Sequence, residues 1–204
     1  MRLFSSLSSA LIAATVLSGC AAKTASDFTT SGFATVAATS TGAEISNSSL
    51  TRRTSGSDTN AAGDGYAYEV GVDGSNGFVA RSGMLSTTSV AALPSTGTAT
   101  MSGTYEVARV TGISLSGSLL TGSAVSASGA LTLTADFAGQ TLTGISDNGL
   151  LAVNGTFNSQ DLNGSVTYRG IPGQLDGLVG GDQAVGVFHG QTSTAIMAGG
   201  FMVD

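Results

Sequence analysis

The most regular feature of the chain is an alternation of apolar and polar side chains that begins at residue 131. Over Leu131–Phe137 every odd-numbered position is apolar and every even-numbered position is polar. A period of two is typical of a β-strand that buries one face and exposes the other. Similar runs fill the second half of the chain and predict eight or nine strands, because 174–179 either ends before 184–189 or continues into it. The predicted strands are 99–107, 113–120, 131–137, 140–145, 150–157, 162–168, 174–179, 184–189 and 195–203.

Short turns and interior glycines suggest how these strands are arranged. The turns are predicted at 138–139, 147–149, 158–161 and 170–173, and connections this short favour antiparallel neighbours in a meander. Most of the strands also contain a glycine near an aromatic or apolar residue. Glycine weakens a flat strand, but it permits kinks that let a small sheet curl and close, with an aromatic ring covering the exposed backbone. The predicted fold class is all-β, a small soluble eight-stranded antiparallel meander barrel.

The side chains on the outward face of this barrel are polar. An eight-stranded barrel has an interior just wide enough to be filled by side chains or to hold one small ligand. A barrel that crosses a membrane presents apolar residues to the lipid, and the outward positions here do not. These positions are Thr132, Thr134, Asp136, Asn154, Thr156, Asn163, Ser165, Thr167 and Arg169.

A shorter β-rich region precedes the barrel. Two β-prone runs, Tyr66–Val70 and Gly77–Arg81, flank the turn-forming residues Val72–Asn76 and predict a hairpin. The loop Asp73–Gly77 also resembles a calcium-binding loop, but it lacks the further oxygen ligands and the closing glutamate that such a site needs. Proline and glycine at 93–97 then separate two units, a handle-like hairpin region at 63–95 and the barrel at 96–204.

The segment 20–62 consists mainly of Ser, Thr, Ala, Gly and Asn. Such a composition buries too little apolar surface to offset the entropy lost on ordering. We therefore expect a flexible tether, with a short strand at most around Phe33–Ala38. Within it, Arg52 and Arg53 are interpreted as a solvated pair and not as a site.

The first residues have the features of an export signal. Arg2 and the free amine precede an apolar stretch, Leu3–Val16, that is too short to span a bilayer core of roughly 30 Å. Leu17–Cys20 then resembles the lipobox of bacterial lipoproteins, in which a peptidase cuts before the cysteine. The expectation is a signal peptide at 1–19 and lipidation of Cys20, the alternative being an ordinary secretory signal with an incidental cysteine. Ala21 and Ala22 follow where an aspartate would mark inner-membrane retention, so the resemblance implies an acylated Cys20 held in the outer membrane.

Composition and charge limit the function classes. The chain has 204 residues, a formal net charge of −6 and about 10% charged residues. Removing residues 1–19 leaves six basic and thirteen acidic residues, a net charge of −7. An acidic surface repels phosphate, and scattered basic residues cannot release counterions from a nucleic acid. No nucleic-acid partner is expected. The basic residues that remain are Lys23, Arg52, Arg53, Arg81, Arg109 and Arg169.

Four segments together resemble a known family. Leu93–Tyr105, Leu131–Phe137, Gly186–Gly190 and Ala198–Phe201, in this order and behind a lipobox, resemble the β-barrel domain of transferrin-binding protein B and related surface lipoproteins. The resemblance covers roughly the C-terminal half. It implies a lipid-anchored lobe in which an eight-stranded barrel adjoins a β-rich handle, and a role in capturing host proteins, haem or other solutes at the cell surface. The chain departs from the large members in having one lobe and no long loops, so no host-contact residue carries over.

Sequence motifs for catalysis are absent from the chain. It contains no Gly-x-Ser-x-Gly elbow, His-Glu-x-x-His helix, Cys-x-x-Cys pair or phosphate-binding glycine loop. His189 is the one histidine, so a Ser-His-Asp site would have to use it with Asp176 or Asp182; a structural strand histidine is preferred. No catalytic residue, metal site or cofactor is therefore predicted. By family analogy His189, Tyr66, Tyr68, Tyr105 or Tyr168 are conceivable haem ligands, and packing is the preferred role for the tyrosines.

The sequence therefore predicts a lipid-anchored bacterial envelope or surface lipoprotein, and not an enzyme. Its barrel is expected to be a binding module for a protein, haem or another solute. The alternative is a structural envelope lipoprotein without a dedicated ligand, which the same sequence would serve equally well. Because a fold does not fix a function, the ligand-binding residues stay unknown at this point.

Overall fold

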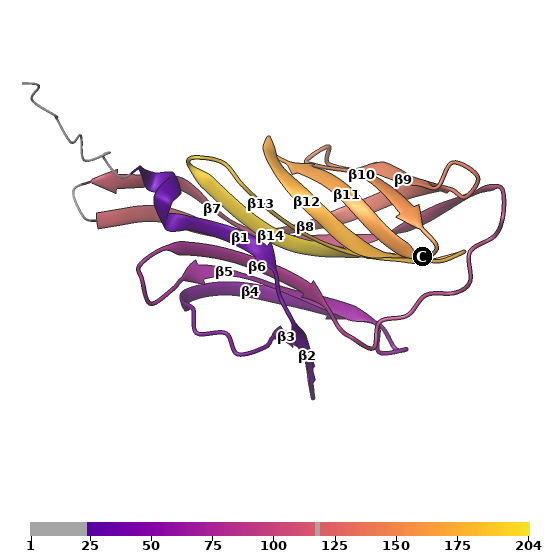
Figure 1. Cartoon of the computed structure of the whole chain (residues 1–204), viewed down its shortest axis with the longest axis horizontal. Coiled ribbons are helices and arrows are strands. Elements are labelled where there is room, and N and C mark those ends of the chain that lie inside the picture. Colours follow the sequence, from indigo (N-terminus) through magenta and orange to yellow (C-terminus); the bar gives the residue numbers. More distant parts are fainter. Residues whose placement is uncertain (1–23, 117–118) are drawn as a thin grey trace, which may run out of the picture.

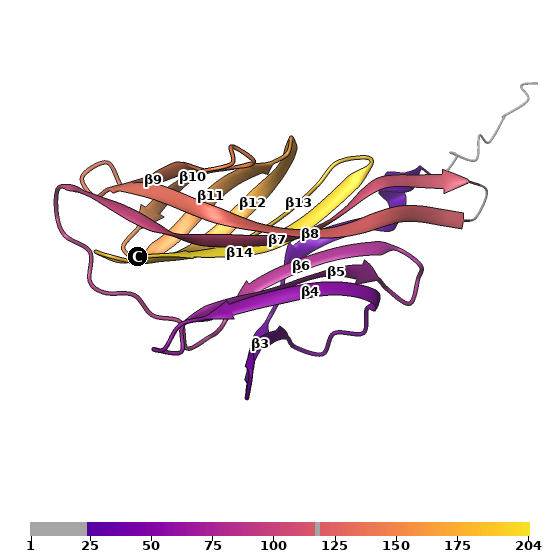
Figure 2. The same ribbon diagram turned by 180° about the vertical axis from the view of Figure 1, so that it is seen from behind.

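The computed structural model describes residues 24–116 and 119–204, and over them the chain is all-β, as predicted. Figures 1 and 2 show a barrel that lies against a second, smaller sheet, which we call the handle sheet. The expected signal peptide at 1–19 and Cys20 lie outside the described residues.

The barrel is closed and eight-stranded. Each strand pairs antiparallel with the next one along the chain, and the last strand pairs back with the first. The sequence left open whether 174–179 continues into 184–189. In the structure the two runs belong to separate strands. The strands are β7 (Thr98–Ser116), β8 (Leu119–Asp136), β9 (Thr141–Ser146), β10 (Leu151–Asn158), β11 (Asp161–Tyr168), β12 (Ile171–Val179), β13 (Ala184–Gln191) and β14 (Ala195–Val203).

One predicted barrel strand was wrong. The range 99–107 lies within β7, but 113–120 is not a strand of its own, because it begins in β7 and ends in β8. A bulge between Thr111 and Ser114, where Gly112 has a φ of 64°, interrupts β7 without ending it. The error arose because residues 119–130 of β8 are mostly exposed on both faces. A strand without a buried face leaves no alternation of apolar and polar residues to detect.

Side chains fill the barrel interior. A single cluster of buried apolar residues from all eight strands occupies it, including Tyr105, Leu133 and Tyr168. Two glycines on neighbouring strands face aromatic rings directly across the ladder: Gly186 pairs with Phe201, and Gly199 pairs with Phe188. A Cβ atom at Gly186 would collide with the Phe201 ring. The glycines therefore leave room for aromatic side chains, as the sequence predicted.

The handle sheet has the order β1-β6-β5-β4 and contains the predicted hairpin as β5 and β6. In the turn between them, the Asp73 carboxylate accepts hydrogen bonds from the Ser75 and Gly77 amides, both at 2.9 Å. The hydrogen bond from the Ser75 hydroxyl is the largest cause that lowers the pKa of Asp73. The strands are β1 (Thr29–Phe33), β4 (Thr51–Thr59), β5 (Gly65–Val72) and β6 (Phe78–Met84).

The expectation of a flexible tether over 20–62 is wrong for residues 29–59. Strand β1, preceded by a short 3-10 helix η1 (Ala25–Phe28), pairs parallel to β6, and β4 pairs antiparallel to β5. A small hairpin of β2 (Val36–Thr39) and β3 (Gly42–Ile45) lies between them in the chain, so the short strand expected near 33–38 corresponds to β2. These segments are ordered because they pair with residues far along the chain. The composition of a segment does not reveal such pairing.

The handle sheet packs on the outer wall of the barrel. Tyr66, Tyr68 and Phe78 of the sheet share an apolar cluster with outward-facing residues of β7, β13 and β14. Strands β13 and β14 are consequently buried on both faces over most of their length. This explains why their sequences are continuous apolar runs and do not alternate.

Candidate functional site

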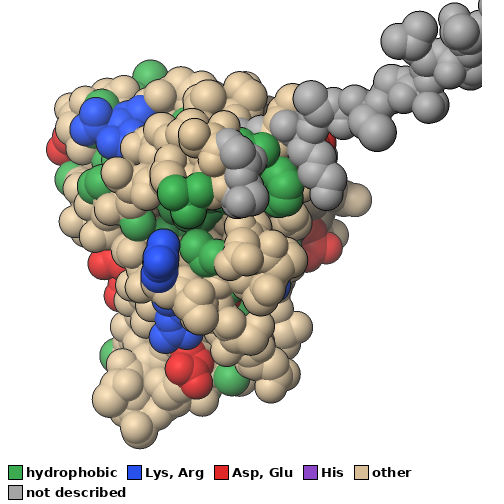
Figure 3. Space-filling view, turned by 90° about the vertical axis from the view of Figure 1, so that its left-hand side faces the viewer, with side chains coloured by type: hydrophobic (Ala, Val, Ile, Leu, Met, Phe, Trp, Pro, Cys, Tyr) green, Lys and Arg blue, Asp and Glu red, His purple; other side chains and the backbone are tan. Residues whose placement is uncertain are grey.

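A groove lies between the handle sheet and the long β7–β8 hairpin. It is a cavity of about 600 Å³, which we call the end groove. Figure 3 views this end of the molecule and shows apolar side chains gathered there, with basic side chains close by. The groove is lined by Thr51, Arg52, Gly71, Val72, Asn76, Phe78, Val110, Leu119, Leu120, Thr121, Gly122 and Ala124.

The end groove exists because the hairpin is longer than its neighbours. Pairing of β7 with β14 ends at Thr111, and pairing of β8 with β9 ends at Leu131. Beyond those residues the two arms pair with each other and rest on the handle sheet. Gly122 allows the close approach, since a Cβ there would lie 2.7 Å from Val110 Cγ1 and 3.0 Å from Phe78 Cζ. Leu119, which lines the groove, is 65% exposed, and Val125, farther along β8 and outside the groove, is 45% exposed.

Arg52 forms part of the groove wall on the handle side. It lies in an irregular part of β4, between the pairs made by Thr51 and Thr54, and has a φ of 50°. Left-handed backbone costs a residue with a Cβ roughly 1 kcal/mol or more. Among the described residues Arg52 makes no ion pair with an acidic side chain. The chain thus holds an exposed cation at the groove in a strained conformation.

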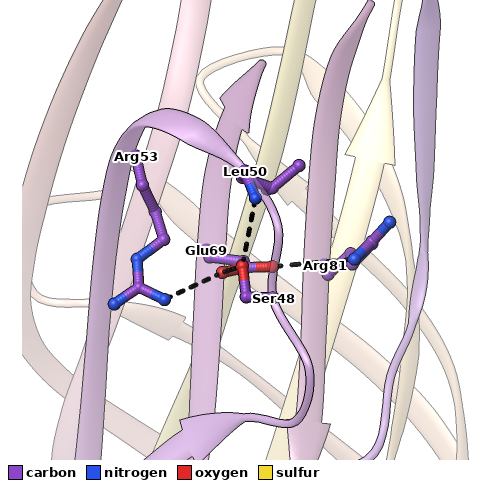
Figure 4. A network of polar contacts seen from close by, with 5 residues as sticks. All are labelled: Ser48, Leu50, Arg53, Glu69 and Arg81. Carbon is purple, nitrogen blue, oxygen red and sulfur yellow. Dashed lines mark hydrogen bonds and ion pairs between the residues drawn. The ribbon is translucent and has the colours of Figure 1, made fainter. Parts of the chain in front are cut away.

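Arg53 behaves differently from its neighbour. Its Nη1 lies 3.5 Å from Oε2 of Glu69, whose side chain is 1% exposed, and Oε2 also accepts a 2.6 Å hydrogen bond from the Ser48 hydroxyl. Arg81 Nη1 approaches the other carboxylate oxygen at 3.9 Å. Figure 4 shows the carboxylate between the two guanidinium groups. A buried carboxylate needs such partners. Arg53 is 40% exposed, as expected, but it also makes a structural ion pair, and this network joins β4, β5 and β6.

His189 lies beside a second hollow, of about 440 Å³, on the side of the barrel near β1. Its Nδ1 is 3.0 Å from the Ser31 hydroxyl oxygen, and the Phe33 ring meets it edge-on at 4.5 Å between centroids. Burial lowers the pKa of His189, which favours the neutral ring. No sequence pattern pointed to Ser31, which lies in the segment expected to be a tether.

Neither aspartate considered as a partner of His189 is hydrogen-bonded to it within the described residues. Asp176 is on β12 and pairs in register with Val187, not with His189. Burial is the largest cause that raises the pKa of Asp176, and Asp161 adds to it. Asp182 lies in the connection between β12 and β13. The structure therefore brings Ser31 and His189 together, and neither acid completes a hydrogen-bonded triad with them among the described residues.

The four tyrosines pack inside the protein. Tyr105 and Tyr168 lie in the barrel core, 6.1 Å apart between ring centroids, whereas Tyr66 and Tyr68 stack between the sheet and the barrel at 6.3 Å. The Tyr68 hydroxyl donates to Glu106 at 3.1 Å. Burial is the main cause that raises the pKa values of Tyr66 and Tyr68. All four are at most 4% exposed, which confirms the packing role.

Nowhere in 24–116 and 119–204 do three or more His, Cys, Asp or Glu side chains form a group that could hold a metal ion. No helix among these residues is long and apolar enough to cross a membrane.

The fold and its hollows define a class of architecture: a closed barrel with a filled interior that carries a handle sheet on its wall, with its open spaces on the outside. The end groove is the larger of the two hollows described above. It is also the one that combines exposed apolar side chains with a cation.

Comparisons with solved structures found resemblances at low sequence identity. A transferrin-binding protein B mutant from Actinobacillus pleuropneumoniae has a TM-score of 0.48 and 12% identity, over 78% of this chain and 83% of that one. For a mutant of the protein from Haemophilus parasuis the values are 0.44 and 11%, over 74% of this chain and 36% of the other, so the chain spans about a third of its length. The haemoglobin receptor HpuA from Kingella denitrificans gives 0.32 and 14%, over 68% and 55%. No family model matches the sequence, and no curated protein matches it.

Proposed function

We propose that the chain is a lipid-anchored outer-membrane lipoprotein that binds a protein partner through the end groove. The observation that carries the proposal is the groove itself, in which exposed Leu119 and a strained Arg52, without an ion pair among residues 24–116 and 119–204, frame a hollow of about 600 Å³. Exposed apolar patches rimmed by polar residues mark interaction sites on soluble folds. Strained residues persist where the surrounding structure enforces them, and they cluster at functional sites.

The filled barrel supports a surface ligand over an enclosed one. The interior cluster includes bulky side chains from every strand, and an eight-stranded barrel has no room beyond such a core for a ligand of appreciable size. A folded protein partner fits the outside of the barrel better than a small molecule does, because the groove is bordered by residues 119–130 of β8, none of which is buried.

The anchor part of the proposal rests on the lipobox at Leu17–Cys20. Several acyl chains on Cys20 would hold the protein stably at a membrane, since each buried methylene contributes roughly 0.8 kcal/mol. The absence of aspartate after Cys20 supports the outer membrane as the destination, and display at the cell surface would expose the groove to partners.

Protease shaving of intact cells tests this function. We expect external protease to remove the wild-type protein, and Cys20→Ala to abolish incorporation of a labelled fatty acid and to release the protein from the membrane fraction. Digestion only after the outer membrane is opened would contradict surface display and favour the structural, inward-facing alternative. Survival of acylation in Cys20→Ala would contradict the anchor.

A further inference from the structure

The outer arm of the long hairpin has a free edge. Strand β8 pairs with β7 along its whole length, but β9 covers its other side only from Leu131 to Asp136. Over Leu119–Ala130 no described strand pairs with that other side, and none of these residues is buried. Figure 2 shows the two arms extending past the rest of the barrel.

The direction of the unpaired backbone groups follows from two hydrogen bonds. The Ala130 carbonyl accepts from Asp147, on the β9 side, and the Phe137 amide donates to Gly97, on the β7 side. In an antiparallel pair the N–H and C=O of one residue point to the same neighbour, and this direction alternates along the strand. The even-numbered residues of β8 therefore point their N–H and C=O groups outward between 120 and 128.

This edge lacks the features that normally prevent further pairing. Exposed edges are usually interrupted by charged residues, proline or bulges. Residues 119–130 contain no charged residue and no proline, and the bulge of the hairpin lies on β7. Strand β4, which forms an edge of the handle sheet, offers a contrast, because it carries Arg52, Arg53 and an irregular register. Only one of the two edges is protected.

A strand added to this edge would direct alternate side chains at the end groove. The β8 side chains at even positions face the handle sheet, as the position of Gly122 beneath Phe78 shows, and cross-strand neighbours share a face. Those side chains would meet the apolar groove walls. An antiparallel segment would run toward the hairpin tip, where Arg52 is the one charged residue that lines the groove.

We propose that the free edge of β8 binds an extended segment of the partner protein as an added antiparallel strand, with an apolar side chain in the end groove and a carboxylate at Arg52. The proposal rests on the proposed function and specifies how its site binds. A second copy of this chain fits less well, since each copy has a net charge of −6, or −7 without residues 1–19, and the copies repel each other. Strand addition derives affinity from backbone hydrogen bonds and specificity from alternate side chains.

The test uses the folded chain and the peptide acetyl-Thr-Val-Thr-Val-Thr-Leu-Thr-Asp-amide, followed by amide hydrogen exchange. We expect bound peptide to slow exchange at Gly122, Ala124 and Ser126 at least tenfold. Two peptides N-methylated on alternate residues serve as matched controls. One set should lose binding at least tenfold and the other should keep it, because only one set of amides faces β8. Equal effects of both sets, or no slowing at about 1 mM peptide, would overturn the proposal.

Two pairs of variants complete the test. Ser126→Pro removes one outward N–H from the edge and should weaken binding at least tenfold, whereas Ser126→Ala should leave it unchanged. Arg52→Gln should weaken binding of the aspartate peptide but not of its asparagine counterpart. Insensitivity to both substitutions would overturn strand addition even if the chain is displayed on cells and binds a protein. If the chain binds the peptide but is not displayed on the cell surface, the proposed function is overturned and strand addition at β8 still holds.

Discussion

Strand β8 is two different strands joined end to end. Residues 131–136 alternate between buried and solvated positions and pair on both sides, whereas residues 119–130 are mostly exposed and pair on one side. The first part closes the barrel and the second forms the open hairpin. The comparison shows that one continuous strand can be packed at one end and open at the other, and that only the packed end has a visible sequence pattern.

The largest expected effect on stability comes from a matched pair of side-chain truncations in β8. Leu133→Ala removes a fully buried side chain from the barrel core and should lower the free energy of unfolding by about 2 to 5 kcal/mol. Val125→Ala, in the open part, should change it by less than about 0.5 kcal/mol. Chemical denaturation measures both. Similar losses for the two variants would mean that the hairpin is buried in solution.

The Glu69 network allows a second comparison, between the two neighbouring arginines of β4. Glu69→Gln leaves Arg53 and Arg81 without their shared carboxylate and should cost about 1 to 3 kcal/mol of stability. Arg52→Gln removes no ion pair among the described residues and should be nearly neutral. Urea unfolding of both variants checks this prediction, and an unchanged stability of Glu69→Gln would remove the proposed connection between β4, β5 and β6.

A smaller effect, of opposite sign, is expected from Arg52→Gly. Glycine adopts a φ of 50° without the Cβ penalty, so this substitution should stabilise the fold by about 0.5 to 1 kcal/mol. It should also weaken partner binding at the end groove. Thermal unfolding and peptide titration measure the two effects on one sample. Destabilisation would show that the arginine side chain supports the fold and is not held there at its expense.

The smallest expected effect concerns His189, which lies beside the second hollow and not at the end groove. Burial lowers the pKa of His189 below 6.5 in the folded chain, so the unfolded chain binds a proton first as the pH falls. The contribution of neutral His189 is therefore present above pH 6.5 and is lost as the pH drops from 6.5 toward the folded value. Urea unfolding at pH 7.5 and 5.5 should show this loss. His189→Gln should lack that part of the pH dependence; an identical dependence in the variant would exclude His189 as its source.

Much of the barrel was predictable because its physics is local. Alternation over 131–137 indicates one buried face. Glycines inside strands indicate that aromatic rings lie over the backbone, as they do at Gly186 and Gly199. The continuous apolar runs of β13 and β14 contained a further signal, since burial on both faces implies a covering layer. That layer is the handle sheet, of which the sequence revealed only the hairpin of β5 and β6.

The rest depends on pairing between distant residues. Thr29 of β1 pairs with Phe78 of β6, and Thr59 of β4 pairs with Gly65 across a loop of polar residues. Neither edge strand has a periodic apolar face, so composition suggested a tether. The end groove was hidden for the same reason: Arg52, Phe78 and Leu119 come from three separate parts of the chain, and only the fold brings them to one hollow.

Amide hydrogen exchange along β8 of the free protein tests the central claim most directly. The account predicts that exchange alternates in the open part, fast at Gly122, Ala124, Ser126 and Ser128 and slow at the odd-numbered residues bonded to β7. It also predicts that the alternation disappears at Leu131–Asp136, where β9 covers the second side. Uniform protection from 119 to 136 would contradict the account, because it would mean that the edge proposed for recognition is already occupied.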